Sequence, residues 1–551
     1  MRLIVLVFAF RFLLLRIVSP FKTAEPSTCH SQHKVGVRRE TAKRPSSSVE
    51  QDGDGEGWKL KIAIVGAGPS GLLLAHRLIA SGLPLEQLDV FESRADPRSS
   101  SSSLEGRAYA LGLGIRGRTA IKTVDGELWS SVKARGYECE RFRLHLSQKL
   151  SLQLRGREDG VHPSVLIYQS DLCSALLDEL ERRAKALETA LNVRFNSNIT
   201  MANLETSTLS FVSDGVTQES KKYDLLVGCD GANSIVRESI KVYSPPDTFE
   251  CTKRELLPGC FKVARITSMP PALDAASVAL ILPKTKSLGI TAFVEPTVDG
   301  GGCVLFAGRL NSESTSSTDS AELGTILYPD PSIGGREQSS MSDEEVEMIR
   351  RLLVEEFPLD GTAGLDDAVR QLLRQRTSVA SSVRCNTYNS KSGLTAAAIC
   401  GDAAHATGGV SGQGANSALV DVATLADCLV KHYQPDDSYS PEAKESMLHQ
   451  SVLAYSMKAV PEGRALYDLS FGNDGRTLPI FRNLRNLLST AIDGVFGGRF
   501  GIGKKPLQTL LASSLDSFVT IRRSRERYYI DPFPSNEEIE SDLNYLYSKL
   551  P

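Results

Sequence analysis

The sequence predicts an α/β protein (α+β overall) with a Rossmann-like nucleotide-binding domain, an inserted antiparallel β-sheet and C-terminal helices. Three observations predict this fold. A β-branched run, 60–65, leads through a glycine-rich turn into an amphipathic helix, which is the start of a doubly wound domain. Two later apolar runs each end at an aspartate. Short β-branched segments between 260 and 307 predict an antiparallel sheet.

The first glycine-rich turn is Gly66-Ala67-Gly68-Pro69-Ser70-Gly71, and a helix is expected over 72–79. Gly66 permits a tight turn, Gly68 lets the backbone approach a pyrophosphate, and Gly71 lets the helix pack closely on the strand. The N–H groups at the start of that helix face the negative charge. The turn therefore predicts a dinucleotide site, although a glycine-rich turn without a ligand is the simpler alternative.

A second strand, 88–91, ends at Glu92, about 20 residues beyond Gly71. A carboxylate at this point accepts hydrogen bonds from adenosine ribose hydroxyls and repels a 2′-phosphate. FAD or NAD therefore fits this half-site better than NADP. Arg94 is a further candidate contact to the cofactor.

The second motif follows the apolar run 223–229, whose composition suits a parallel strand that is buried on both faces. Asp230 and Gly231 then fall at the carboxyl end of the strand, where doubly wound sheets bind their ligands. Arg237 would add positive charge close to the pyrophosphate. Asp230 could equally cap the helix that follows, and both roles are compatible.

The third motif follows a strand expected at 396–400. Asp402 lies just beyond it, and the segment Gly412-Gln413-Gly414-Ala415-Asn416 opens a long helix. Free N–H donors at that helix start suit the electron-rich carbonyl side of a reduced flavin, while Asp402 can accept from the ribityl hydroxyls. His405 could act as a general base, but a structural hydrogen bond is the favoured interpretation. Three such motifs along one chain indicate FAD.

In order and wording, these motifs resemble those of the FAD-dependent aromatic hydroxylases, the single-component flavoprotein monooxygenases, and particularly the kynurenine 3-monooxygenase group. The resemblance runs from about residue 59 to about residue 476 and is densest at four segments: 106–118, 226–232, 401–416 and 468–473. It implies that Arg107 contacts FAD and that Asn473 contacts the substrate.

The chain departs from that family pattern at several positions. Gln169 replaces an arginine that meets FAD; para-hydroxybenzoate hydroxylase has a glutamine at a similar place, so a contact to FAD is still expected. Gly409 aligns with a proline beside the reactive carbon of the flavin, and Gln508 replaces a substrate tyrosine. Arg141 and Arg143 are the candidates for binding a substrate carboxylate, but neither aligns cleanly. Kynurenine itself is therefore not fixed as the substrate.

No second fingerprint for a resident dinucleotide is visible in the sequence, which indicates that NADPH or NADH visits only transiently. We expect a monooxygenase that hydroxylates a small aromatic substrate with O2 through a flavin C4a-hydroperoxide. The alternatives are an epoxidase or reductase acting on an isoprenoid or quinone, and a flavin-binding protein without oxygenase activity. No catalytic acid or base and no metal ligand can be assigned.

Composition agrees with this class of protein. A chain of 551 residues with 41% hydrophobic content supports two or three domains, and the formal net charge of −3 disfavours nucleic-acid binding. The ten cysteines have neither metal-site nor CxxC spacing. A reducing compartment is therefore expected.

The first 58 residues look like a targeting and linker segment. An apolar run at 3–18 is interrupted by Arg11 and Arg16 and is followed by a basic, Ser/Thr-containing stretch. This pattern favours a mitochondrial or plastid address over a transmembrane anchor. Membrane association is expected only through this segment, because no stretch of about 18 uncharged apolar residues occurs near the C-terminus.

The expected domain organisation is discontinuous. A targeting segment (1–58) precedes three parts of an FAD-binding domain, at 59–140, 166–245 and 385–435. Substrate-domain strands at 141–165 and a main substrate domain at 246–384 separate these parts. A helical region, 436–551, completes the chain.

Overall fold

The computed structural model describes residues 59–99, 109–147, 150–156, 162–285, 288–308, 341–434, 440–473 and 507–548, with isolated positions at 323, 327, 476, 478, 479, 482, 486 and 505. The expected targeting segment and Arg107 lie outside these residues.

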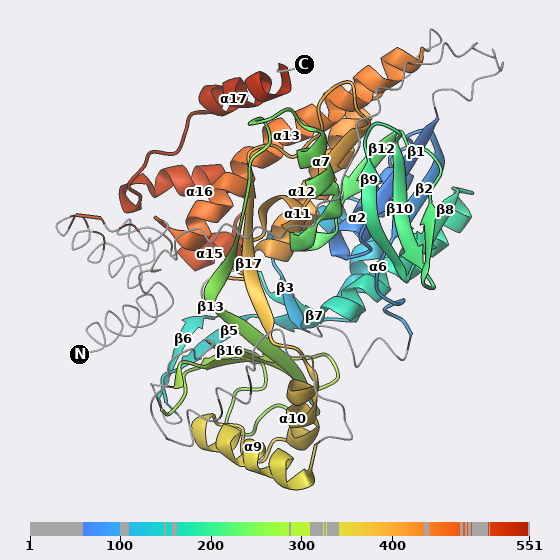
Figure 1. Cartoon of the computed structure of the whole chain (residues 1–551). Coiled ribbons are helices and arrows are strands. Elements are labelled where there is room, and N and C mark those ends of the chain that lie inside the picture. The colour runs from blue at the N-terminus through green and yellow to red at the C-terminus, as the bar shows by residue number, and fades with distance from the viewer. Residues whose placement is uncertain are drawn as a thin grey trace.

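A five-stranded sheet forms the nucleotide-binding part, and all four of its strand pairings are parallel (Figure 1). The strands, in spatial order, are β18 (Ala396–Ile399), β12 (Leu225–Gly228), β1 (Leu60–Val65), β2 (Leu85–Phe91) and β8 (Leu191–Arg194). The predicted strands before the three glycine motifs are therefore confirmed, and the motifs meet at one edge of the sheet because parallel strands share a carboxyl end.

Different layers cover the two faces of this sheet. Three helices pack together on one side: α2 (Pro69–Ala80), α6 (Gln169–Ala186) and α12 (Gly414–His432). The other side carries α7 (Ile235–Tyr243) and a three-stranded antiparallel sheet of β9 (Ser197–Asn203), β10 (Thr208–Ser213) and β11 (Val216–Glu219). Phe91 of β2 packs on Phe211 of β10 with ring centroids 5.3 Å apart, which joins the two sheets.

A small antiparallel sheet and two helices lie beside the motif edge. The sheet contains β3 (Ala110–Leu113), β7 (Ser164–Tyr168) and β4 (Tyr137–Cys139), and the helices are α4 (Ile115–Lys122) and α5 (Gly126–Ala134). Strand β7 runs directly into α6 at Gln169, and α4 packs on α12. This sheet therefore connects the nucleotide-binding part to the larger inserted sheet.

The inserted sheet has seven strands and is built from two distant parts of the chain (Figure 1). In spatial order they are β17 (Ser378–Cys385), β13 (Cys251–Ile266), β16 (Gly302–Gly308), β15 (Thr291–Pro296), β14 (Ser277–Ile281), β5 (Arg141–His145) and β6 (Ser151–Arg155). Neighbouring strands are antiparallel, as expected, except for β14 and β5, which pair in parallel. The exception arises because β5 comes from a separate segment and is not connected to β14 by a hairpin.

Helices α9 (Asp343–Glu356) and α10 (Leu365–Arg374) contribute to the core on one face of this sheet. Ser342 caps α9, because its Oγ accepts a hydrogen bond from the Glu345 N–H at 3.2 Å. The apolar residues of α9 and α10 then face Ala264 and Ile266 of β13.

A lysine, Lys262, lies in this core with only 2% of its surface exposed. Its Nζ donates a hydrogen bond to the carbonyl oxygen of Leu372, in the last turn of α10, at 2.8 Å. Burial lowers the pKa of Lys262 to about 8, since the charged ammonium is poorly solvated there. The charge is therefore a cost to the folded state at neutral pH.

We expect Lys262→Met to stabilise the protein at pH 7 by about 2 kcal/mol, the desolvation cost less the lost hydrogen bond. Between pH 8 and 10.5, Lys262 is protonated in the unfolded chain but not in the folded chain. The free energy of unfolding of the wild type should therefore rise with pH across this range, and that of the variant should lack this contribution. Urea unfolding at about pH 7 and about pH 10 measures both effects. Equal pH dependence in the two proteins would contradict this account.

The C-terminal region is helical, as predicted, with α13 (Pro441–Phe471), α15 (Leu507–Ser513), α16 (Phe518–Ser524) and α17 (Asn536–Ser548). Helix α15 ends at Ser513, and Ser517 caps α16 by accepting a hydrogen bond from the Thr520 N–H. No helix in the described part of the chain is long and apolar enough to cross a membrane.

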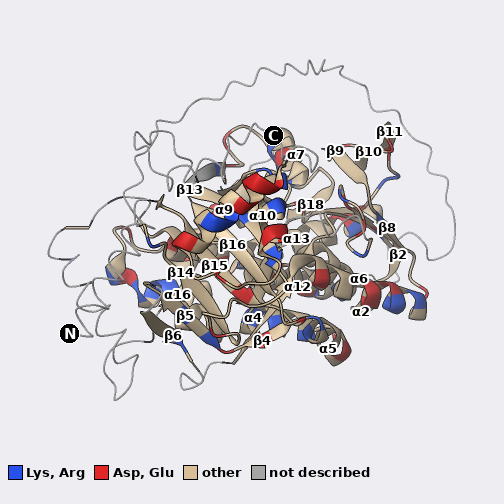
Figure 2. Cartoon of the chain, turned by 90° about the horizontal axis from the view of Figure 1, so that it is seen from below, with Lys and Arg blue, Asp and Glu red and all other residues tan. Residues whose placement is uncertain are grey.

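Basic and acidic positions are interspersed along the outer helices, including α2, α5 and α9, in the view of Figure 2. This distribution accompanies a formal net charge of only −3.

Candidate functional site

Close packing at the motif edge explains two of the glycines. Gly66 has a φ of +104°, and a Cβ there would lie 2.4 Å from the carbonyl oxygen of Cys229, which directly follows β12. A Cβ on Gly71 would lie 1.9 Å from the carbonyl oxygen of Gly66. These glycines therefore let the first turn pack against the second motif and against its own helix.

Other motif glycines face open space. A Cβ added to Gly68, Gly231 or Gly412 would meet no atom within 4 Å in the described structure. Gly68 is the N-cap of α2, and no side chain caps that helix. Uncapped helix N–H groups and an open approach suit a phosphate group. Pro69 and Ser70 form the first turn of the same helix.

Glu92 follows β2 and lies against the first turn. Its Oε2 accepts a hydrogen bond from the Ala67 N–H at 3.0 Å, and its Oε1 accepts from the Arg94 Nε at 2.8 Å. Burial opposes ionisation of Glu92, but the hydrogen bonds and charge of Arg94 outweigh it and lower the carboxyl pKa. An ionised acid is therefore held where the sequence predicts an adenosine ribose, with Arg94 as its partner.

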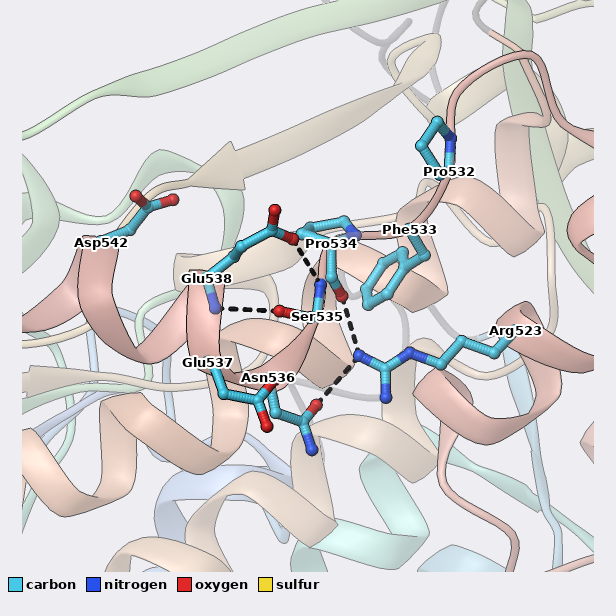
Figure 3. Close-up of a pocket in the computed structure, with 9 residues that line it drawn as sticks. All are labelled: Arg523, Pro532, Phe533, Pro534, Ser535, Asn536, Glu537, Glu538 and Asp542. Carbon is cyan, nitrogen blue, oxygen red and sulfur yellow. Dashed lines mark hydrogen bonds between the residues drawn. The ribbon is translucent and has the colours of Figure 1, made fainter.

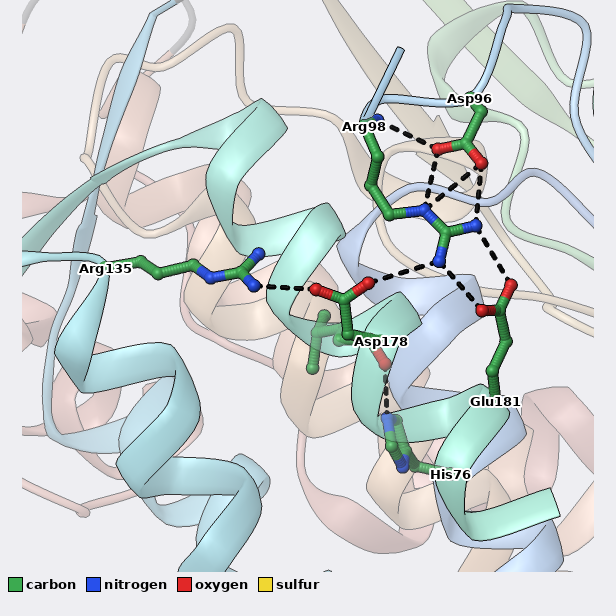
Figure 4. A network of polar contacts seen from close by, with 7 residues as sticks. His76, Asp96, Arg98, Arg135, Asp178 and Glu181 are labelled. Carbon is green, nitrogen blue, oxygen red and sulfur yellow. Dashed lines mark hydrogen bonds and ion pairs between the residues drawn. The ribbon is translucent and has the colours of Figure 1, made fainter. Parts of the chain in front are cut away.

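The segment after Glu92 is fixed by a network of ion pairs (Figure 4). Arg98 binds Asp96 in its own loop and also Asp178 and Glu181 on α6, and Arg135 binds Asp178 at 2.6 Å. Single exposed pairs contribute about 0–1 kcal/mol, but shared partners add geometric definition. The network ties the end of β2 to α6 and so helps to fix the position of Glu92.

The second motif combines a cap with an unpaired carboxylate oxygen. Asp230 Oδ2 accepts from the Ile235 N–H at 2.7 Å, so the capping role is confirmed. Asp230 Oδ1 is buried and has no hydrogen-bond partner among the described residues. Burial raises the pKa of this carboxyl, although Ser234 and the helix N–H groups oppose the shift. A buried acceptor with one free oxygen suits a ligand hydroxyl.

Arg237 connects the second and third motifs. It is 2% exposed, and its guanidinium donates from Nη1 to the Ala403 carbonyl and from Nη2 to the Ala232 carbonyl, both at 3.0 Å. The guanidinium is therefore bound to backbone carbonyls of both motifs, and Arg237 holds the two loops in position.

The third motif begins at Asp402, whose exposed side chain opens α11 (Asp402–His405). His405 is buried, and its Nε2 lies 2.5 Å from Asp421 Oδ2, which also accepts from the Gly401 N–H. Burial opposes protonation of His405, but Asp421 outweighs it and raises the histidine pKa. The favoured structural role of His405 therefore agrees with its surroundings. Thr407 Oγ1 is buried and has no partner among the described residues.

Asn416 braces the third motif against the β3–α4 segment. Its Oδ1 accepts from the Gly114 N–H at 2.8 Å, and its Nδ2 donates to the Gly112 carbonyl at 2.9 Å. The side chain is thus engaged with protein, which makes Asn416 a positioning residue. Gln413 and Ala415 flank Gly414 at the start of α12, and the Gln169 N–H donates to the Tyr109 carbonyl at the start of α6.

One face of the seven-stranded sheet is turned towards β3 and β7. The strand register places Val263, Leu305 and Phe293 side by side on this face. On β14, Leu280 pairs with Phe293 and therefore lies on the same face, as does Val278 two residues earlier. Phe142 of β5 pairs with Val278 and extends this face. Tyr168 and Tyr109 pack against this face from the nucleotide-binding part. An apolar surface between the two parts is where a substrate beside a bound flavin would lie.

Two charged residues share that face, and neither belongs to a sequence motif. Arg265 and Glu295 are both cross-strand partners of Cys303. The Arg265 guanidinium lies 3.8 Å from the Tyr168 ring centroid, and burial raises the pKa of Glu295 to about 7. A lone glutamate within the β-branched run 291–296 was the available signal, but its face could not be known without the register.

The structure does not bring the predicted substrate residues to this face. Arg141 and Arg143 pair with Ser277 and Ala279, so they lie on the opposite face, where Ala279 belongs to the core with α9 and α10. Both also approach Asp274, Arg141 at 2.8 Å and Arg143 at 3.5 Å. Strand alternation is the physical reason, because Phe142 between them points the other way.

Asn473 is likewise engaged elsewhere. Its Nδ2 donates to the Tyr528 carbonyl at 3.1 Å, and its Oδ1 accepts from the Ile530 N–H at 2.7 Å. The side chain therefore holds the segment after α16. Gln508 is exposed on α15. The predicted contacts of Arg141, Arg143 and Asn473 with a substrate gain no support from their positions.

A surface pocket lies far along the chain from these motifs, between Arg523 of α16 and the start of α17 (Figure 3). Arg523 donates there to the Pro534 carbonyl at 2.8 Å and to Asn536 Oδ1 at 3.0 Å. No residue of the three motifs lines this pocket. Among the described residues, no group of three or more His, Cys, Asp and Glu side chains could hold a metal ion.

The comparisons with known proteins agree with this site. Residues 59–327 match a family model described as an FAD binding domain. Kynurenine 3-monooxygenase from Salinispora tropica is 27% identical over 422 residues, covering 75% of this chain and 79% of the relative. The Saccharomyces cerevisiae kynurenine 3-monooxygenase is 23% identical over 393 residues, covering 67% of this chain and 74% of the relative.

A solved structure shows the same fold. The tetrameric form of 2-methyl-3-hydroxypyridine-5-carboxylic acid oxygenase superposes with a TM-score of 0.51 at 17% identity, covering 75% of this chain and 93% of that one. The open glycines and the free oxygen of Asp230 also fit the cofactor that the family model names. The chain is therefore an FAD-dependent oxidoreductase that carries an FAD-binding domain and is similar to the kynurenine 3-monooxygenases.

Proposed function

We propose that the chain uses NADPH or NADH and O2 to hydroxylate a small aromatic substrate, as its kynurenine 3-monooxygenase relatives are named for doing. Two observations support the proposal: the open glycine motifs, which suit the cofactor, and the apolar sheet face that packs against Tyr168 and Tyr109, which suits an aromatic substrate. When bound, FAD supplies the electron transfer and oxygen activation that side chains cannot provide.

The chain's own residues would bind, orient and exclude water. Gly68 and the start of α2 would meet the pyrophosphate, Glu92 the adenosine ribose, and the start of α12 the flavin carbonyls. The apolar floor around Phe293 and Leu305 would hold an aromatic ring and keep water from the reaction. Arg265 and Glu295, the charged residues on the same face, would orient polar groups of the substrate.

Glu295 gives this proposal a testable pH dependence. Its pKa is about 7, so its carboxylate becomes available to accept from a substrate N–H as the pH rises through neutrality. We expect wild-type kcat/KM to rise across this range, and Glu295→Gln to lose that limb with a KM about tenfold higher, or roughly 1.4 kcal/mol of lost binding. Steady-state kinetics between about pH 6 and about pH 8.5 measure the profile.

Glu344→Gln, on the exposed surface of α9, is the matched control and should leave the profile unchanged. A Glu295→Gln variant that retains the wild-type pH limb would remove Glu295 from the substrate surface.

The activity itself is tested with purified full-length protein. Visible flavin absorbance establishes the cofactor, and NADPH or NADH oxidation is followed while kynurenine, other aromatic amino acids, phenols, quinones and isoprenoids are added in turn. Mass spectrometry with ¹⁸O₂ then asks whether a stimulating compound gains one oxygen atom. Hydroxylation of an aromatic compound supports the proposal, and oxygenation of an isoprenoid or quinone alone would favour the epoxidase or reductase.

One observation favours a second candidate, a flavin-binding protein without oxygenase activity. Gly409 has a φ of +79°, which a proline cannot adopt because its ring fixes φ near −65°. The loop that carries the family's proline therefore has a different backbone path here. Bound FAD without any compound that stimulates NAD(P)H oxidation would establish this candidate.

The address of the protein is a separate proposal. We infer from the basic, Ser/Thr-containing sequence of 1–58 that this segment directs the chain to a mitochondrion or plastid. N-terminal sequencing of the mature protein tests it, since an intact Met1 on the mature protein would contradict cleavage.

A further inference from the structure

Two cysteines face each other where the two parts of the molecule join. Cys251 begins β13, Cys385 ends β17, and the antiparallel register makes them direct cross-strand partners. At the next pair, the Asn386 N–H donates to the Glu250 carbonyl at 3.0 Å, so that pair is hydrogen-bonded. Because the two pair types alternate, Cys251 and Cys385 form a non-hydrogen-bonded pair, with Cα atoms about 4.5 Å apart.

This spacing falls within the range of about 4.4–6.8 Å that disulfides bridge without backbone movement. Both thiols are free in the structure. Cys251 is partly exposed, while Cys385 is 1% exposed. Cys251 is therefore the more accessible residue of the pair.

The surroundings activate the exposed member. The hydrogen bond with the Cys385 thiol lowers the pKa of Cys251 to about 7, burial opposes the shift, and the Arg237 charge assists it. Glu238 opposes and Lys241 assists as further charges on the facing helix α7. The same contact and burial raise the pKa of Cys385. One thiol is thus a ready nucleophile near neutral pH, and its partner stays protonated.

We propose that Cys251 and Cys385 are a peroxide-reactive dithiol whose oxidation to a disulfide staples β13 to β17. The Cys251 thiolate attacks hydrogen peroxide, the O–O bond breaks, and a sulfenic acid forms as one water leaves after protonation. The Cys385 sulfur then attacks the Cys251 sulfur, an S–S bond forms, and the second water leaves. Two thiols lose two electrons and two protons, and one peroxide becomes two waters.

The position of the staple gives it a structural effect. Strands β13 and β17 run side by side at one edge of the seven-stranded sheet, and β17 also contacts α11 (Figure 1). Cys385 belongs to the core of the nucleotide-binding part, whereas Cys260, further along β13, belongs to the core with α9 and α10. The disulfide would therefore fix the end of the connection that lies beside Arg237 and the motif loops.

A second cysteine pair provides an internal control. Cys229 and Cys400 follow neighbouring parallel strands, and the Cys400 N–H donates to the Gly228 carbonyl at 2.9 Å. The Cys400 contact and burial raise the pKa of Cys229 well above its ordinary value. The Cys229 thiol therefore stays protonated, and peroxide should leave it reduced.

The test uses the full-length protein treated with a small molar excess of hydrogen peroxide near neutral pH. Thiol counting after denaturation should show the loss of two thiols, and peptide mapping should show Cys251 joined to Cys385, reversibly on reduction. Cys385→Ser should instead leave a sulfenic acid on Cys251 that dimedone labels, while Cys229→Ser should behave as wild type. Circular dichroism confirms that each variant is folded.

The wild-type peptide map alone decides the question if a variant fails to fold. A map without the Cys251–Cys385 peptide overturns the proposal, whether the thiols remain unreacted or Cys251 advances to the sulfinic acid. Peroxide cross-linking of Cys229 to Cys400 in preference to the proposed pair would overturn it equally.

Discussion

Replacing Gly68 with valine is expected to abolish FAD binding without unfolding the protein. Gly68 has φ −73° and ψ 179°, an extended conformation that valine adopts without strain, and an added Cβ meets no atom within 4 Å. The new methyl groups would occupy the approach to the start of α2, where the pyrophosphate must come close to the backbone. We expect FAD affinity to fall by at least about 100-fold, or roughly 2.7 kcal/mol.

Flavin absorbance of the purified variant and FAD titration of the apoprotein measure this loss, and circular dichroism checks the fold. The matched control is Gly126→Val, since Gly126 is also open to an added Cβ but lies at the exposed start of α5. Normal flavin content in Gly68→Val would show that the cofactor does not approach this turn, and the proposed site would be lost with it.

Arg237→Met is expected to destabilise the protein by about 3 kcal/mol, because the carbonyls of Ala232 and Ala403 lose a buried donor. The second and third motifs should then loosen against each other, so FAD affinity should fall about tenfold, or roughly 1.4 kcal/mol. Urea unfolding and FAD titration measure the two effects separately. Methionine nearly preserves the volume of the side chain, so a packing defect contributes little.

Lys241→Met, on the exposed surface of the same helix α7, is the matched control and should change neither quantity. If Arg237→Met retains wild-type stability, the hydrogen bonds of the guanidinium to the two motifs do not contribute to the free energy of unfolding. Weak FAD binding at wild-type stability would instead indicate that Arg237 meets the cofactor directly.

The sequence predicted the cofactor half of the molecule well because its signals are local. Leu60–Val65 forms a strand with the predicted bounds, and the turn at Gly66 and the helix after it follow within 20 residues. Positions that require a positive φ or close backbone packing are occupied by glycine, so they can be recognised in the sequence without knowledge of the tertiary structure. The cap at Ser342 was predictable for the same reason.

The substrate half was less predictable because its geometry depends on long-range pairing. Strand β5 meets β14 from a segment more than 100 residues earlier in the chain, and only this register shows which side of β5 faces the cofactor part. The sequence therefore suggested Arg141 and Arg143 as substrate contacts, whereas Phe142 is the residue of β5 that faces the cofactor part. Arg265 and Glu295 escaped notice because alternation alone does not identify the facing partner.

The order of strands in the parallel sheet governs how the protein can be synthesised. Strand β18, which leads into the third motif, joins the edge of the sheet beside β12 only after the entire seven-stranded insertion has been translated. A nascent chain that ends where the FAD-binding match ends would have β12 as an exposed edge strand and would lack the third motif of the cofactor site. We therefore expect FAD to bind only after β18 has been synthesised, and we expect fragments that end before β18 to associate with one another through β12.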